Sequence, residues 1–133
     1  MAHYHNPSFL KLVEDAKTRV EEFDVPEFVR RIEAGERWVL VDIREDHEWQ
    51  AGHIPGATHI GRGILERDAE TRFPEKDTPL VLQCGGGFRS ALSADNLQRM
   101  GYTRVVSLDG GIRAWVEAGY GVVKDGAPPA SGS

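Results

Sequence analysis

The 133-residue chain has one cysteine, Cys84, so no disulfide can form within it. Disulfides mark oxidising compartments, and a lone thiol therefore favours a cytoplasmic protein. No apolar run approaches the ~20 residues needed to cross a bilayer. The first residues also lack a basic segment followed by an apolar one, so we expect neither a membrane span nor a secretory signal.

Positive charge is also scarce. The chain has 16 Lys and Arg against 21 Asp and Glu, a net charge of −5, which argues against a nucleic-acid partner. His3 and His5 suggest a metal site, but a solvated terminus is the simpler interpretation, and we expect no metal and no cofactor. With 40% hydrophobic and 28% charged residues, the chain has the composition and length of one globular domain.

The most informative stretch surrounds Cys84. A predicted buried strand ends at this residue, three glycines follow, and Arg89 and Ser90 stand where a helix would begin. Glycines allow a tight turn whose N–H groups converge on one anion, and the helix start adds further donors. Such donors favour a thiolate. An inert, buried cysteine is the alternative, but the combination indicates a nucleophile in an anion-binding loop.

Spacing separates two chemistries. Loops of the protein-tyrosine-phosphatase and arsenate-reductase kind place arginine six residues after cysteine, whereas Arg89 follows Cys84 by five. The pattern Cys-x-x-Gly-x-Arg-Ser resembles the active-site loop of rhodanese-like sulfurtransferases. Two further stretches resemble signatures of that family: 41–57, which contains Asp-x-Arg and Gly-His-Ile-Pro-Gly-Ala, and the Gly-Gly-x-x-x-Trp segment that ends at Trp115.

The resemblance covers residues 26–120 and implies transfer of a sulfane sulfur through a persulfide on Cys84. The donor would be thiosulfate or another persulfide, small or protein-borne, and the acceptor cyanide or a thiol. Gly85 and Gly86 lack the basic side chain of some thiosulfate-preferring relatives, which keeps both kinds of donor open. The expected donor-binding residues are those of the loop: Gly85, Gly86, Gly87, Phe88, Arg89 and Ser90.

Three supporting residues are expected nearby. Asp42 and Arg44 follow a strand, and a structural role in fixing loops is favoured over catalysis for Asp42. Asp109 either braces the active-site loop or caps the next helix, and we favour capping. Arg62 either approaches the site or is solvated, and His53 is interpreted as a turn residue rather than a base.

Two other functions stay open. The domain could mainly dock a partner, with Phe9 and Leu12 of an amphipathic N-terminal helix as the contact surface. A single thiolate could also act as a redox sensor through oxidation to sulfenic acid. Without a second cysteine no resolving thiol exists within the chain, which argues against a thioredoxin-like enzyme.

Strands that alternate with helices predict a single α/β domain: a central, mostly parallel sheet with helices on both faces. Ligands bind such folds at the carboxyl ends of the strands, where Asp42, Cys84 and Asp109 are expected. We divide the chain into an amphipathic helical extension, the rhodanese-like domain and a flexible tail, at residues 1–22, 23–121 and 122–133. Residues 61–73 are expected to form a loop with a helical turn.

Overall fold

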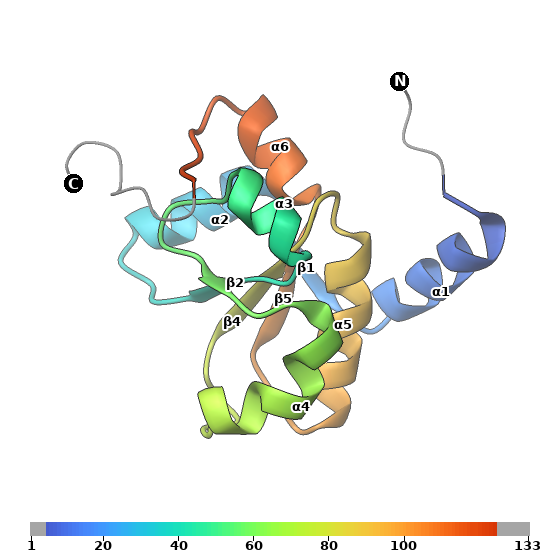
Figure 1. The fold of residues 1–133 in the computed structure, drawn as a ribbon. Coiled ribbons are helices and arrows are strands. Elements are labelled where there is room, and N and C mark those ends of the chain that lie inside the picture. Colours follow the sequence, from blue (N-terminus) through green and yellow to red (C-terminus); the bar gives the residue numbers. More distant parts are fainter. Residues whose placement is uncertain (1–4, 125–133) are drawn as a thin grey trace.

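The computed structural model describes residues 5–124, in which helices and strands alternate around one sheet (Figure 1). The sheet has five strands in the order β1-β5-β4-β2-β3, and each neighbouring pair is parallel. The predicted α/β class is confirmed. The elements are α1 (Pro7–Lys17), β1 (Glu21–Phe23), α2 (Val25–Glu33), β2 (Val39–Asp42), α3 (Asp46–Ala51), β3 (Thr58–His59), α4 (Arg62–Arg72), β4 (Leu80–Gln83), α5 (Phe88–Arg99), β5 (Val105–Leu108) and α6 (Gly111–Glu117).

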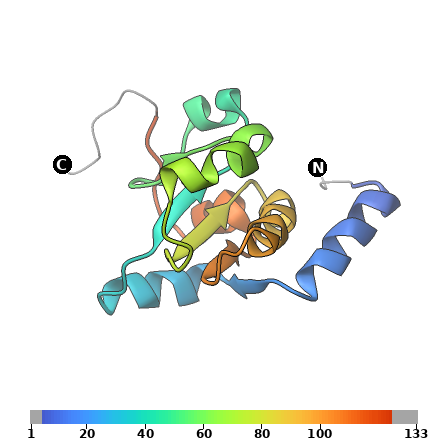
Figure 2. The same cartoon turned by 90° about the horizontal axis from the view of Figure 1, so that it is seen from below.

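Each face of the sheet carries its own hydrophobic core, because alternate residues of a strand point to opposite faces. On one face, Val41 and Leu82 pack with Leu65 of α4 and Leu97 of α5. On the other face lie their strand neighbours, together with side chains of α2 and α6: Leu40, Val81, Val106, Phe28 and Trp115. Figure 2, turned by 90°, shows helices on both sides of the sheet, as predicted.

The helix starts follow from local sequence. The Asp24 carboxylate accepts a hydrogen bond from the Glu27 N–H at 2.8 Å, and Pro26 lies in the first turn of α2, which are the residue types typical of these positions. Glu45 and Glu48 form a capping box at the start of α3. The capping box fixes the position of Glu48, whose carboxylate also binds Arg89.

Two predicted elements are wrong in extent. The N-terminal helix expected within residues 1–22 ends at Lys17, and Glu21–Phe23 instead pairs with β5 as an edge strand. Three residues with one buried side chain are too short to show a strand's alternation. Residues 62–72 form an eleven-residue helix, α4, instead of a loop. Its buried residues are Leu65 and Ala69, whereas the apolar Ile64 is exposed, so the helix shows only a narrow apolar stripe among mostly polar residues.

The ends of the described chain both pack on the domain. Val13 and Ala16 of α1 are buried, and α1 runs beside α5 (Figures 1 and 2). Val123 pairs with His53 through two backbone hydrogen bonds of 2.8 and 2.9 Å. The expected flexible tail otherwise lies outside the described residues from 125 onwards. Within residues 5–124, every helix is too short or too polar to cross a membrane.

Candidate active site

The Cys84 loop connects β4 to α5 and surrounds the sulfur with hydrogen-bond donors. The Gly87 N–H donates to the Cys84 Sγ at 3.1 Å, and the Ser90 N–H does so at 3.4 Å. Cys84 is buried, with 1% of its surface exposed. Gly87 has φ +95°, and a Cβ there would lie 2.9 Å from the Gly110 nitrogen. Only glycine fits that turn.

A pair of buried hydroxyl groups lies next to the sulfur. The Ser90 Oγ is 3.5 Å from the Cys84 Sγ and 2.7 Å from the Ser107 Oγ. Ser107 belongs to β5, and both serines are fully buried. Because a hydroxyl can rotate, the Ser90 O–H can donate to a thiolate while it accepts from Ser107. Sequence reasoning missed Ser107, since a serine within an apolar strand carries no motif.

The start of α6 holds the base of the loop. The N–H groups of Ile112 and Arg113 donate to the carbonyl oxygens of Cys84 and Gly85, at 2.9 and 3.1 Å. A helix start has unpaired N–H groups, and here the loop accepts two of them. The contact requires Gly111, because a Cβ there would lie 2.3 Å from the Cys84 carbonyl oxygen. The Gly-Gly-x-x-x-Trp segment therefore positions the cysteine.

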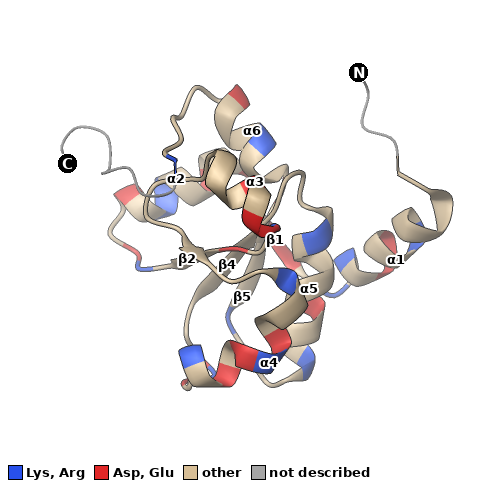
Figure 3. Cartoon of the chain, in the orientation of Figure 1, with Lys and Arg blue, Asp and Glu red and all other residues tan. Residues whose placement is uncertain are grey.

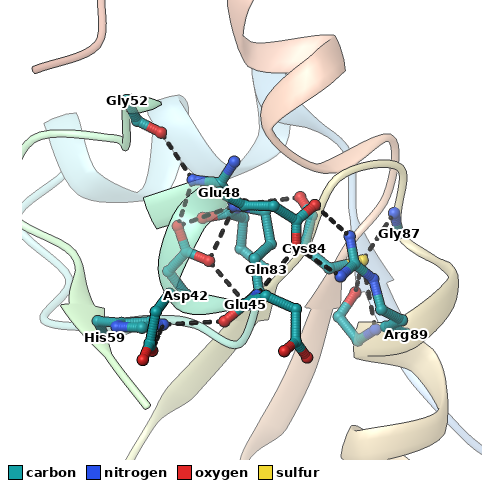
Figure 4. A network of polar contacts seen from close by, with 12 residues as sticks. Asp42, Glu45, Glu48, Gly52, His59, Gln83, Cys84, Gly87 and Arg89 are labelled. Atoms are coloured by element: carbon teal, nitrogen blue, oxygen red, sulfur yellow. Dashed lines mark hydrogen bonds and ion pairs between the residues drawn. The ribbon is translucent and has the colours of Figure 1, made fainter. Parts of the chain in front are cut away.

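Arg89 is held by a carboxylate from another helix (Figure 4). Its Nη1 and Nη2 donate to the two carboxylate oxygens of Glu48, at 2.8 and 3.1 Å. These hydrogen bonds lower the pKa of Glu48 from 4.5 to about 2 and raise the pKa of Arg89. The expected anion-binding arginine is thus already paired. Sequence reasoning quoted Glu48 within a family signature but did not place it at the site.

Asp42 and Arg44 form a buried ion pair beside this loop (Figure 4). The Arg44 Nη2 donates to the Asp42 carboxylate at 2.8 Å and to the Gly52 carbonyl oxygen at 2.7 Å. The Arg44 Nε and backbone N–H each donate to the Asp42 Oδ1 at 3.0 Å. These contacts fix the loop after β2 against the end of α3. This arrangement agrees with the structural role favoured for Asp42.

The capping role predicted for Asp109 is wrong. The N-cap of α6 is Gly110, in the left-handed conformation at φ +78°, and no side chain caps this helix. The Asp109 side chain is exposed, while its backbone N–H donates to the Phe23 carbonyl oxygen at 2.8 Å. The left-handed turn at Gly110 sets the start of α6, so the aspartate at the strand end is not used as a cap.

Within residues 5–124, His53 makes its hydrogen bonds and ring contacts with Trp49 and Val123 and not with the Cys84 loop. Its Nδ1 is 2.9 Å from the Trp49 carbonyl oxygen, and its ring stacks on the Trp49 ring at a centroid distance of 3.4 Å. His53 is buried at the turn after α3, as its interpretation as a turn residue requires.

A pocket of about 490 Å³ opens onto Cys84. Its lining combines residues of the Cys84 loop and the start of α5 with the residue before α1's N-cap and side chains of α1, α3, α4 and α6: His5, Phe9, Glu48, Arg62, Cys84, Gly86, Phe88, Arg89 and Arg113. Of the two positions left open for Arg62, the structure shows the one near the site. Sequence reasoning missed the contributions of His5, Phe9 and Arg113, because they come from elements distant along the chain.

Another hollow, of about 580 Å³, lies between α2 and α6 and is mostly apolar. None of the predicted site residues lines it, so the Cys84 pocket is the candidate active site. Within residues 5–124, no cluster of three or more His, Cys, Asp and Glu side chains is placed to hold a metal ion.

The Glu48–Arg89 pair makes a pH-dependent contribution to stability. A carboxylate whose pKa is lowered by folding stabilises the protein fully above its unfolded pKa, here near 4.5, and loses that contribution as pH falls towards 2. The difference in unfolding free energy between wild type and Glu48→Gln should therefore be constant above pH 4.5 and shrink below it. Urea unfolding at a series of pH values measures this difference.

The matched control for that experiment is Arg89→Gln, which removes the same ion pair from the other side. It should remove the same acid-dependent contribution as Glu48→Gln. A difference between wild type and Glu48→Gln that stays constant down to about pH 3 would contradict the role of Arg89 in lowering the pKa of Glu48.

Comparison with known proteins places this geometry in a family. The Rhodanese profile, described as the rhodanese-like domain, matches residues 24–118. The putative sulfurtransferase YtwF of Bacillus subtilis is 35% identical over 96 residues, 72% of this chain and 90% of that protein. The thiosulfate sulfurtransferase GlpE of Pseudoalteromonas translucida is 37% identical over 82 residues, 62% of this chain and 75% of that protein.

Other matches differ in length and in description. The chain spans about half (51%) of a putative sulfur carrier protein of Bacillus subtilis, with 29% identity. A solved structure from Rhodopseudomonas palustris, of unknown function and described as a possible tyrosine phosphatase, has a TM-score of 0.78 and 31% identity. That superposition covers 92% of this chain and 99% of the other. From the profile match and the close relatives, the chain belongs to the rhodanese-like domain family.

Proposed function

We propose that this chain is a sulfurtransferase that carries a sulfane sulfur on Cys84 as a persulfide. The observation that supports this most directly is the pair of N–H groups, from Gly87 and Ser90, that point at the Cys84 Sγ. Preorganised donors of this kind stabilise negative charge on the reacting atom. The names of the relatives, a putative sulfurtransferase and a thiosulfate sulfurtransferase, agree with the proposal.

With thiosulfate as donor, the first step is a displacement at sulfur. The Cys84 thiolate attacks the outer sulfur, an Sγ–S bond forms, the S–S bond of thiosulfate breaks, and sulfite leaves with the electron pair. No proton, oxidant or reductant is required. The persulfide then gives its outer sulfur to cyanide, which forms thiocyanate, or to a thiol, and the thiolate is restored. Covalent catalysis of this kind divides one transfer into two displacements.

The pocket supports sulfur transfer over phosphoryl transfer. Arg89 follows the cysteine by five residues, and both terminal nitrogens of its guanidinium already donate to the Glu48 carboxylate, which compensates the charge that a phosphate would need. A phosphoryl group calls for a bidentate arginine with free donors. A persulfide needs only donors close to the sulfur, such as the Gly87 and Ser90 N–H groups that donate to the Cys84 Sγ.

A thiol that must return to the reduced state after each turnover works best in a reducing compartment. We therefore propose a cytoplasmic location, with a small-molecule or protein sulfur donor and a thiol acceptor. Docking through α1 and redox sensing remain the competing functions, and the following experiment separates them from transfer.

The test is the intact mass of reduced protein after incubation with thiosulfate or with a small-molecule persulfide, with Cys84→Ser as control. We expect a wild-type species one sulfur atom heavier that is removed by dithiothreitol and discharged by cyanide with formation of thiocyanate. The Cys84→Ser protein should gain nothing. If neither donor produces the heavier species, sulfur transfer is rejected. Peroxide would then be expected to add oxygen to Cys84 if the residue is a sensor.

A further inference from the structure

We propose that the Arg113 guanidinium is the anion-binding group of the Cys84 pocket and holds the charged end of a small sulfur donor. The inference deepens the proposed function, because it assigns to α6 the positive charge that the loop itself lacks at Gly85 and Gly86. It predicts a preference for anionic donors, of which thiosulfate is the test case, over neutral ones.

The first support is the position of the guanidinium. The Arg113 backbone is anchored to the loop, since its N–H donates to the Gly85 carbonyl oxygen at 3.1 Å. Its side chain lies against Gly86, where an added Cβ would be 2.6 Å from Nη1. The guanidinium therefore fills the space that a side chain at position 86 would take. The absence of a side chain at Gly86 therefore leaves the space that the Arg113 guanidinium occupies.

The second support is the pairing of the charges. Arg89 is already bound to Glu48 through two hydrogen bonds. Arg113, in contrast, has no ion pair with any residue of the described part of the chain (5–124), and its side chain is exposed. Its charge is thus available to an incoming anion, whereas the charge of Arg89 is compensated by the Glu48 carboxylate.

The third support is the charge of the pocket as a whole. The lining has three arginines, Arg62, Arg89 and Arg113, against the one carboxylate of Glu48, so it keeps an excess positive charge even with Cys84 as a thiolate, although the chain has a net charge of −5. These arginines stand in the first turns of α4, α5 and α6, helices whose basic residues are blue in Figure 3. A local cationic site on an anionic protein attracts small anions.

The geometry also places this charge close to the reacting atom. Nitrogens of Arg89 and Arg113 both lie within 4 Å of the point where a Cβ on Gly85 would be, directly after the nucleophile. Thiosulfate is a dianion that must approach a thiolate. A guanidinium next to the approach path offsets that repulsion. His5, Phe9 and Phe88 also line the pocket, and the His5 and Phe88 ring centroids are 4.7 Å apart, so this part of the lining is aromatic and the cationic groups are the arginines.

The experiment compares Arg113→Gln, Arg113→Lys and Arg104→Gln with wild type. Arg104 lies over the Trp38 ring at 5.2 Å, at the amino end of β5 and away from the pocket, so its variant removes the same charge elsewhere. The rate constant for persulfide formation from thiosulfate, measured by intact mass, should fall about tenfold in Arg113→Gln. It should be partly restored in Arg113→Lys and unchanged in Arg104→Gln.

A second measurement does not depend on sulfur transfer. Iodoacetate is anionic and iodoacetamide neutral, so the ratio of their alkylation rates at Cys84 reports the positive potential at the sulfur. This ratio should fall in Arg113→Gln and be kept in Arg113→Lys and Arg104→Gln. If wild type forms the persulfide but Arg113→Gln changes neither the loading rate nor the ratio, the inference is overturned and the proposed function stands.

Failure of the proposed sulfur transfer can also be told apart from failure of the anion site. If no donor loads Cys84 while the alkylation ratio still falls in Arg113→Gln, the anion site is supported and sulfur transfer is rejected. If Cys84 reacts with neither reagent and no donor loads it, the pocket is not a reactive site and both proposals fall.

Discussion

Replacing Asp42 by alanine is expected to lower the free energy of unfolding by about 3–5 kcal/mol, the usual cost of leaving one member of a buried ion pair without its partner. Asp42 is fully buried and Arg44 is 7% exposed. Without the carboxylate, the guanidinium keeps the Gly52 carbonyl oxygen as its acceptor, and its charge is not compensated. Urea unfolding at neutral pH measures the loss.

The matched control is Asp68→Ala, which removes a carboxylate from the exposed pair with Arg67. Exposed ion pairs contribute about 0–1 kcal/mol, so this variant should change little. The double variant Asp42→Ala/Arg44→Met no longer contains the unpaired Arg44 guanidinium, so part of the lost free energy of unfolding should return. Equal effects of Asp42→Ala and Asp68→Ala would show that burial of the Asp42–Arg44 pair does not matter.

The Gly111→Ala variant is expected to lose both stability and reactivity of Cys84. The added Cβ would stand 2.3 Å from the Cys84 carbonyl oxygen and 2.8 Å from the Gly85 carbonyl group, and these atoms are backbone that cannot rotate away. Overpacking of an interior costs about 1–3 kcal/mol. The left-handed backbone at φ +55° adds roughly 1–2 kcal/mol for a residue with a Cβ.

Relief of that clash requires α6 to move away from the loop, which breaks the hydrogen bonds from Ile112 and Arg113 to the loop carbonyls. We therefore expect slower persulfide formation in whatever folded protein remains, measured by intact mass beside urea unfolding. Gly63→Ala is the control: that position lies in α4 with nothing within 4 Å of an added Cβ. Its helix should gain up to ~1 kcal/mol. If Gly111→Ala forms the persulfide at the wild-type rate, the hydrogen bonds from α6 are not needed to position Cys84.

The sequence singled out the Cys84 loop as the candidate site because its signal is local. A strand, a cysteine, three glycines and a helix start are consecutive, and turn chemistry depends on neighbouring residues. The cap of α2 by Asp24 is equally local, because the Asp24 carboxylate binds an N–H three residues further along the chain. Local patterns misled where the periodic signal was weak: β1 has three residues, and α4 buries only Leu65 and Ala69.

The family and the α/β sheet could therefore be predicted from the sequence, whereas the charge distribution of the site could not. Glu48, Ser107 and Arg113 come from α3, β5 and α6, and they meet Cys84 because parallel strands end at one edge of the sheet. Which arginine is neutralised and which is free depends on distances between these elements. The pairing of Arg89 with Glu48, and the place of Arg113 over Gly86, were decided by the tertiary structure alone.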